Sequence, residues 1–259
     1  MDKRLEFVKN FYDNYEEDNR LKLQQNFLEY QTTLNYITKY AKKGCKILEI
    51  GAGTGAYSVA LAKNGYNVTS VELVESNLKV LKQNAKGIKN IQCFQGDAIN
   101  LSQFKDNSFD IVLSLGPMYH LFAKKDINKA ISEAIRVCKK GGIIMLAYIS
   151  SSSVVWNSGV LKGHLKQLEP LIKSNGSLKR VPNEVFSAYF VDEFEALFDN
   201  RTKFIKDVAT DSVSVLLRES INKFSKDELE LLLKWHLKTC ESRDMLGLSC
   251  HLLYICQKV

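Results

Sequence analysis

Hydrophobic positions in the middle of the chain fall into two alternating patterns. Short, nearly continuous apolar runs predict buried strands, and after most of them apolar residues recur at the three- and four-residue spacing of a helix. The runs lie at 45–50, 68–71, 91–94, 111–115 and 143–149, and the last follows a turn predicted at Gly141 and Gly142. Strands that alternate with helices imply right-handed crossovers and a parallel sheet. The pattern therefore predicts an α/β fold with a sheet buried on both faces.

Looser segments flank this alternating region. Before it, apolar residues step by three or four positions and predict one helix of about five turns, at Leu23, Phe27, Tyr30, Leu34, Ile37 and Ala41. After residue 150, four leucines at similar spacing predict one helix inside a longer excursion, at Leu161, Leu165, Leu168 and Leu171. Residues 191–198 predict a short helix, a capping box at Ser225 and Glu228 opens another, and runs at 204–208 and 252–256 predict two more strands.

The length and composition are those of one globular domain. The chain has 259 residues, of which 45% are hydrophobic and 25% charged. We divide it into an N-terminal helical cover (1–44), a core (45–149), an insertion or lid (150–200) and C-terminal strands and helices (201–259). Whether the insertion forms a lid or a dimer surface is left open.

Charge and cysteine usage place the chain in a broad class. The N-terminus is too polar for a signal peptide, no apolar run has the length of a membrane helix, and the six cysteines form no C-x-x-C pair. These features predict a cytoplasmic protein with reduced cysteines, with no metal site and no membrane partner. The net charge of +7 is spread along the chain rather than gathered into a block, so it indicates a lysine-rich surface, and RNA stays an alternative partner.

A glycine-rich turn follows the first strand, in the sequence CKILEIGAGTGAYS at 45–58. Gly51, Gly53 and Gly55 stand at alternate positions before a predicted helix, which is the entry to a nucleotide-binding unit. Glu49 lies inside the apolar run before them, where a carboxylate needs partners. It could hold the glycine loop through backbone N–H groups or meet a cationic ligand group. With Ala56, the turn also satisfies a loose dinucleotide pattern, so a nicotinamide cofactor remains a second hypothesis.

Acids also follow the next two strands. Glu72 stands about twenty residues after the glycines, where an acid can accept both hydroxyls of a ribose. Asp97 follows the third strand, and the alternative for it is a helix cap. In an open α/β sheet ligands bind at the carboxyl ends of the strands, so these acids are expected to converge on one ligand site.

These motifs together resemble the class I S-adenosylmethionine-dependent methyltransferases, in particular their small-molecule, ubiquinone-biosynthesis-like branch. The resemblance rests on E-x-G-x-G-x-G at 49–55, G-D-A at 96–98, L-G-P-x-Y-H-L at 115–121, R-V-x-K-x-G-G at 136–142 and the terminal HLLYICQK at 251–258. Lys140 replaces a proline that is usual there. The resemblance implies a Rossmann-like, doubly wound, seven-stranded sheet, mostly parallel with an antiparallel last strand.

The resemblance also implies a cofactor and a site. The cofactor would be S-adenosylmethionine, with S-adenosylhomocysteine as product. Its binding residues would be Arg20, Glu49, Gly51, Ala52, Gly53, Gly55, Glu72, Leu73, Asp97, Ala98 and Leu115. Glu49 suits a sulfonium cofactor, whose tail carries an ammonium, better than it suits the anionic pyrophosphate of NAD. Arg20 is expected to bind the tail carboxylate, and the alternative for it is a surface pair with Glu16 or Glu17.

Methyl transfer is an in-line displacement, for which the enzyme mainly aligns a nucleophile. Tyr119 and His120 follow the fourth strand, where an acceptor should lie, and His120 has the pKa range of a base near neutral pH. Tyr12 and Tyr15 are expected to line the pocket. The alternative for all four side chains is simple packing.

The motifs favour a small-molecule acceptor. The Asn/Asp-Pro-Pro-Tyr stretch of base-amine methyltransferases and the Pro-Cys nucleophile of cytosine-C5 enzymes are both missing from the sequence. The alternatives kept are an RNA methyltransferase, an NAD-dependent oxidoreductase and a non-catalytic cofactor-binding module. The acceptor, the methylated atom and the oligomeric state stay open at this point.

Overall fold

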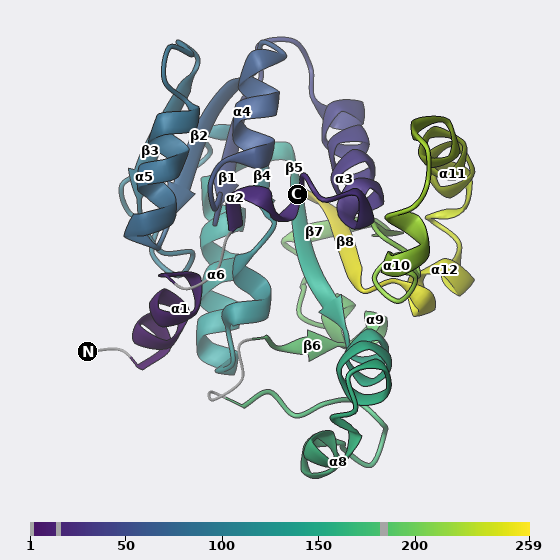
Figure 1. Cartoon of the computed structure of the whole chain (residues 1–259). Helices are drawn as coiled ribbons and strands as arrows, with labels where there is room; N and C mark the ends of the chain where they lie inside the picture. Colours follow the sequence, from purple (N-terminus) through teal and green to yellow (C-terminus); the bar gives the residue numbers. More distant parts are fainter. Residues whose placement is uncertain (1–2, 14–16, 182–185) are drawn as a thin grey trace.

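The computed structural model describes residues 3–13, 17–181 and 186–259 (Figure 1). Its centre is a sheet in the order β3-β2-β1-β4-β5-β8-β7. The strands are β1 (Lys46–Ile50), β2 (Asn67–Glu72), β3 (Ile91–Gln95), β4 (Phe109–Ser114), β5 (Cys138–Ser150), β7 (Thr202–Ala209) and β8 (His251–Lys258), while the short β6 (Ala188–Tyr189) pairs with the end of β5. The strands β1 to β5 are parallel, and β8 lies antiparallel between β5 and β7. The predicted fold is confirmed.

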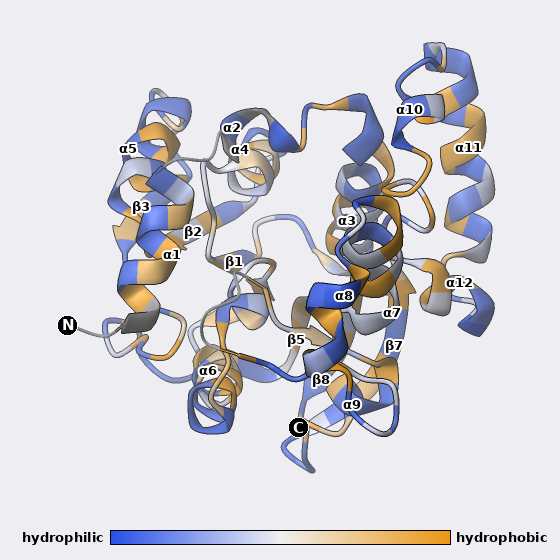
Figure 2. Cartoon of the chain, turned by 60° about the horizontal axis from the view of Figure 1, so that its bottom comes forward, coloured by the Kyte–Doolittle hydropathy of each residue, from blue (hydrophilic) through white to orange (hydrophobic). Residues whose placement is uncertain are grey.

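Three crossover helices cover the first five strands. Helices α4 (Ala56–Lys63) and α5 (Glu75–Asn84) pack on β2 and β3, and α6 (Lys124–Val137) packs on β4 and β5. Their buried residues recur at helical spacing, as Ile127, Ala130, Ile131 and Ala134 do in α6. Figure 2 shows hydrophobic and hydrophilic residues interspersed along α5 and α11 (Lys226–Thr239), and in α11 Leu229 and His236 are buried while Leu231 and Trp235 are exposed.

The remaining helices are short or lie outside the crossovers. At the N-terminus they are α1 (Lys3–Asp13), α2 (Glu17–Arg20), the 3₁₀ turn η1 (Gln24–Asn26) and α3 (Phe27–Tyr40). The 3₁₀ turn η2 (Pro117–His120) follows β4, and the insertion holds α7 (Ser151–Val154), the π-helix η3 (Val155–Leu161), α8 (Leu165–Leu168), η4 (Glu169–Leu171) and α9 (Val191–Glu195). Near the C-terminus lie α10 (Arg218–Ile221), α11 (Lys226–Thr239) and α12 (Arg243–Leu248).

The core lies on both faces of the central strands. Leu48, Val112 and Leu113 are fully buried, and so is the run Leu252–Cys256 of β8, apart from small exposed fractions. Burial of one such side chain contributes about 1.5–3 kcal/mol. The strand β8 is therefore a central element of the sheet, although it comes last in the chain.

Three details differ from the predictions. The N-terminal helix begins at Phe27, and Leu23 lies before it with 49% of its surface exposed. The single helix expected at 161–171 is broken into shorter pieces, because Gly163 adopts a left-handed φ of 75°. The strand β5 already begins at Cys138, which pairs with Phe109, so the predicted glycine turn is an irregularity within the strand.

Other predicted features are confirmed. The short helix expected at 191–198 is α9. The capping box is formed, since Ser225 Oγ accepts from the Glu228 N–H at 3.3 Å and the Glu228 carboxylate accepts from the Ser225 N–H at 2.7 Å. Within the described ranges, no helix has both the length and the apolar character needed to cross a bilayer.

Candidate active site

A cleft of about 900 Å³, part of it open to solvent, lies at the carboxyl ends of β1, β2 and β4. That is the edge at which ligands bind in open α/β sheets. All but one of the residues predicted to bind the cofactor or the acceptor line it, namely Arg20, Glu49, Gly51, Ala52, Gly53, Glu72, Leu73, Asp97, Ala98, Leu115, Tyr119 and His120. Their sequence positions span a hundred residues, so it is the parallel sheet that brings them together.

The glycine turn forms the floor of the cleft. Gly51 has a left-handed φ of 71°, and a Cβ atom there would lie 2.7 Å from Pro117 Cδ. The N–H groups of Gly51 and Ala52 both donate to the Val71 carbonyl, at 2.8 and 3.0 Å. A larger residue at position 51 would therefore push the turn away from the loop after β4.

Glu72 holds this turn in place. It is 5% exposed, one carboxylate oxygen accepts from the Gly53 N–H at 2.7 Å, and the other accepts from the Val74 N–H at 2.8 Å. Holding the glycine loop was one of the two roles that the sequence suggested for Glu49, and the structure gives a bond of this kind to Glu72. The acid after β2 thus shapes the loop as well as facing the cleft.

Glu49 lies beneath the cleft and is 1% exposed. Its carboxylate accepts from the Ser58 hydroxyl, which in turn accepts from the Ser70 hydroxyl at 2.6 Å. Burial raises the pKa of Glu49 to about 8, against the lowering effect of its bonds to Ser58, and the nearby Glu72 raises it further. Neither serine was predicted from the sequence, although both are fully buried polar residues.

Gly55 is the predicted cofactor residue that does not line the cleft, so its role in cofactor binding stays a prediction. It precedes α4 with a φ of 92°, and a Cβ atom there would lie 2.3 Å from Leu81 Cδ1. Gly55 is needed for the turn and for close packing between α4 and α5. Alternation along the chain did not distinguish it from Gly51 and Gly53.

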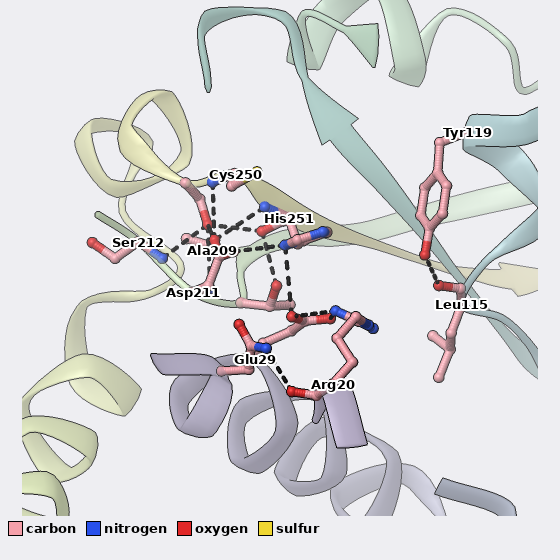
Figure 3. Close-up of polar contacts among 12 residues, drawn as sticks. Arg20, Glu29, Leu115, Tyr119, Ala209, Asp211, Ser212, Cys250 and His251 are labelled. Carbon is pink, nitrogen blue, oxygen red and sulfur yellow. Dashed lines mark hydrogen bonds and ion pairs between the residues drawn. The ribbon is translucent and has the colours of Figure 1, made fainter. Parts of the chain in front are cut away.

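Arg20 comes to the cleft from α2 and is bound to Glu29 on α3. The Arg20 Nη1 atom lies 3.0 and 2.9 Å from the two Glu29 carboxylate oxygens, as Figure 3 shows. The alternative partners, Glu16 and the side chain of Glu17, lie outside the described residues, as does Tyr15. Glu29 was not predicted from the sequence, although an acid on the buried face of an amphipathic helix indicates that it needs a partner.

Aromatic side chains from α1 and η2 line one part of the cleft, which we call its aromatic end. The Tyr12 hydroxyl of α1 and His120 Nε2 of η2 lie 2.8 Å apart, and their rings meet edge to face. The Tyr119 hydroxyl donates to the Leu115 carbonyl at 2.8 Å (Figure 3). Phe186 of the insertion contacts the rings of both Tyr119 and His120. Tyr119 and His120, the predicted acceptor residues, thus share one wall with Tyr12.

The donor set suits S-adenosylmethionine. Glu49, Glu72 and Asp97 place carboxylates around the glycine turn, and Arg20 supplies one cation. An anionic pyrophosphate would meet repulsion from Glu72 and Asp97, whereas a cofactor with a ribose, an adenine, an ammonium and one carboxylate offers a partner to each group. The fold and the site together define a class I methyltransferase that uses S-adenosylmethionine.

Similar proteins of known family support the assignment to the methyltransferases. A methyltransferase domain family matches residues 48–146. The demethylmenaquinone methyltransferase of Staphylococcus haemolyticus is 31% identical over 169 residues, which cover 62% of this chain and 69% of that protein. That of Staphylococcus epidermidis is 32% identical over 137 residues, 52% of this chain and 55% of that protein, so the chain spans only about half the length of this relative.

Solved structures show the same fold. Magnesium protoporphyrin IX methyltransferase from Synechocystis, with bound S-adenosylhomocysteine, aligns with a TM-score of 0.64 at 12% identity, covering 99% of this chain and 100% of that one. Phosphoethanolamine N-methyltransferase 1 from Haemonchus contortus aligns with a TM-score of 0.61 at 17% identity, covering 99% and 49%. The chain belongs to the small-molecule branch of the S-adenosylmethionine-dependent methyltransferases.

Proposed function

We propose that this enzyme transfers a methyl group to a nucleophile on a small aromatic acceptor. The observation that carries the proposal is the hydrogen bond between Tyr12 and His120 at the aromatic end of the cleft. Aromatic side chains contact a flat ring by stacking and by edge-to-face packing. The relatives above are named for methylation of demethylmenaquinone, and a quinone-like ring belongs to the class of acceptor that such a wall favours.

The other end of the cleft would hold the cofactor, which supplies a methyl group bonded to a sulfonium. Glu72 would accept from the ribose hydroxyls, and Asp97 with Ala98 would lie beside the adenine. Arg20 would bind the carboxylate of the tail, and Glu49 its ammonium. The bare backbone at Gly51 and Gly53 lets the ligand approach closely.

The residues of the aromatic end would align the acceptor and handle its proton. Alignment of two reactants in a fixed geometry supplies much of the rate of such a displacement. A base is required only where the nucleophile keeps a proton, as a phenol does. His120, oriented by the Tyr12 hydroxyl, would accept that proton, while Tyr119 is held by the Leu115 carbonyl and shapes the wall.

The test combines a measurement of cofactor binding with a measurement of methyl transfer. Calorimetric titration should show S-adenosylhomocysteine bound and NAD not bound. Transfer of a labelled methyl group should then be measured with phenols and quinols, amines, carboxylic acids and RNA as separate acceptors.

Tyr12→Phe and His120→Asn should lower kcat for the best aromatic acceptor by about 10²-fold, within the usual range for an acid–base group, and leave S-adenosylhomocysteine affinity within about twofold. Tyr66 lies just before β2, at the end of the strand away from the cleft. Tyr66→Phe is therefore the matched control and should keep the kcat of the natural enzyme. Transfer to RNA alone, or an unchanged kcat in both variants, would refute the proposal.

A further inference from the structure

Four ionisable side chains form a continuous chain that begins at the cleft and ends beneath β8. Arg20 lines the cleft and binds Glu29, and Glu29 Oε2 lies 3.7 Å from His251 Nδ1. His251 Nδ1 lies 2.7 Å from Asp211 Oδ2. Figure 3 shows these residues lying one after another, from α2 and α3 to the segment after β7 and the start of β8. Of these four residues, only Arg20 was assigned a role from the sequence.

Asp211 is held rigidly at the far end. Its Oδ1 accepts from the Ser249 hydroxyl at 2.7 Å and from the backbone N–H groups of Cys250 and His251 at 2.9 and 3.0 Å. The side chain is 1% exposed. Asp211, Cys250 and His251 lie close enough together to surround a cation, but both Asp211 oxygens already have hydrogen-bond partners, so the contacts are those of a hydrogen-bonded Asp–His pair.

The surroundings of His251 favour its charged form. The charged groups that face it are Arg20 from α2, Glu29 from α3 and Asp211 from the segment after β7, while β5 places Ile149 opposite it. Burial alone would lower the pKa of His251 and Arg20 lowers it too, but the carboxylates of Glu29 and Asp211 outweigh both, so that the pKa is raised above its ordinary 6.5. The thiol of Cys250 stays neutral because burial raises its pKa.

The proton on His251 decides the net charge of the group. With the proton, Arg20 and His251 balance Glu29 and Asp211. Without it, one negative charge is left over, and Glu29 interacts with Arg20 alone. Side-chain exposures of 21% for Arg20, 9% for Glu29 and 20% for His251 mean that water screens these interactions only in part.

We propose that His251 is a positioning residue for the cofactor. Through Glu29, its protonated form leaves the Arg20 guanidinium able to bind the carboxylate of the cofactor's tail. This inference rests on the proposed role of Arg20 in the cleft. It makes cofactor affinity depend on pH, with tighter binding on the acid side of the His251 titration and weaker binding on the alkaline side.

The ligands for the test are S-adenosylhomocysteine and 5′-methylthioadenosine, which shares the adenosine and sulfur but has no amino-carboxylate tail. Both should be titrated by calorimetry from about pH 6 to about pH 8.5, a range that begins near the ordinary pKa of a histidine and extends above it. The dissociation constant of S-adenosylhomocysteine should rise about fivefold or more across this range, a usual size for coupling between two sites. That of methylthioadenosine should stay constant.

Variants separate His251 from other titrating groups. His251→Asn is permanently neutral, and Glu29→Gln removes the carboxylate between Arg20 and His251. Each variant should abolish the pH step, that is, the rise of the S-adenosylhomocysteine dissociation constant with pH. His251→Asn should bind S-adenosylhomocysteine at all pH values as weakly as the natural enzyme does at high pH. His164 is exposed on the insertion, so His164→Asn is the matched control and should keep the pH dependence of S-adenosylhomocysteine binding. Titration of Glu49 would act in the opposite sense, because its ionisation at high pH favours an ammonium.

Each result has a defined meaning. Failure of both ligands to bind would refute the cofactor assignment itself. Binding of S-adenosylhomocysteine without a pH step, or with a step that persists in His251→Asn, would refute the role of His251 alone. A step that EDTA removes would assign the coupling to a metal and overturn the proposal. The comparison of the two ligands in the natural enzyme stays informative even where a variant does not fold.

Discussion

Gly55→Ala is expected to destabilise the fold while leaving the cofactor site intact. The substituted residue would have to keep a φ of 92°, which costs an L-residue about 1–2 kcal/mol. The new methyl group would also lie 2.3 Å from Leu81 Cδ1. Leu81 is fully buried and packs with Ala52 and Leu78, so it has little room to move, and such overpacking costs about 1–3 kcal/mol. The expected total is about 2–5 kcal/mol.

Gly65→Ala is the matched control for this change. Gly65 follows the other end of the same helix, α4, with nearly the same φ of 89°, but a Cβ atom there meets nothing within 4 Å. It should therefore lose only the conformational part, about 1–2 kcal/mol. Since about 1 kcal/mol shifts Tm by about 2–4 °C in a chain of this size, the two variants should differ in Tm by about 2–12 °C.

The assay is thermal and urea unfolding of both variants, followed by calorimetric titration of each folded protein with S-adenosylhomocysteine. We expect Gly55→Ala to melt well below Gly65→Ala and to keep the affinity of the natural enzyme at a temperature where it is folded. Equal melting temperatures would refute the packing role of Gly55. Loss of affinity in a fully folded Gly55→Ala protein would show that Gly55 contributes to cofactor binding.

Two further changes test the acids of the cleft. Glu72→Ala removes the acceptor for two backbone N–H groups and for the expected ribose hydroxyls, so S-adenosylhomocysteine affinity should fall at least about tenfold. Glu75→Ala, which changes an exposed acid of α5, is the control and should leave this affinity nearly unchanged. Unchanged affinity in Glu72→Ala would disprove the ribose assignment. Burial raises the pKa of Glu49 to about 8 in the folded protein, so folding favours its protonated form. As the pH rises from about 5 to about 8, the free energy of unfolding should therefore fall by up to about 1.4 kcal/mol per pH unit because of Glu49. Glu49→Gln should remove that part of the slope in urea unfolding at several pH values, and an identical slope in the variant would show that Glu49 ionises normally.

Several site residues were predictable because of a general property of parallel sheets. The carboxyl ends of neighbouring parallel strands meet at one edge, so Glu72, Asp97 and Leu115, each at or just after the end of a different strand, had to converge. The glycine turn after β1 marks the same edge. For these residues, the local sequence pattern and the strand topology predict the same position at the carboxyl edge of the sheet.

Other residues depended on packing that the local pattern does not record. Gly55 has the same spacing as Gly51 and Gly53, but the left-handed turn before α4 directs it at α5 instead of the cleft. The leucines at 161–171 have helical spacing, but a left-handed Gly163 interrupts them. In both places the backbone conformation, which spacing alone does not reveal, decided the outcome.

The sequence by itself determined the alternating α/β core, the antiparallel last strand expected from the resemblance to known methyltransferases, and the edge of the sheet where the cleft lies. Only the tertiary structure decided which buried charges face one another. Glu29 and His251 are more than two hundred positions apart, and they meet because β8 inserts beside β5 and starts below α3. An isolated acid or histidine in an apolar stretch shows that a partner is needed, since an unpaired buried charge is costly. The partner itself is fixed by long-range strand order and register, which no short stretch of sequence contains.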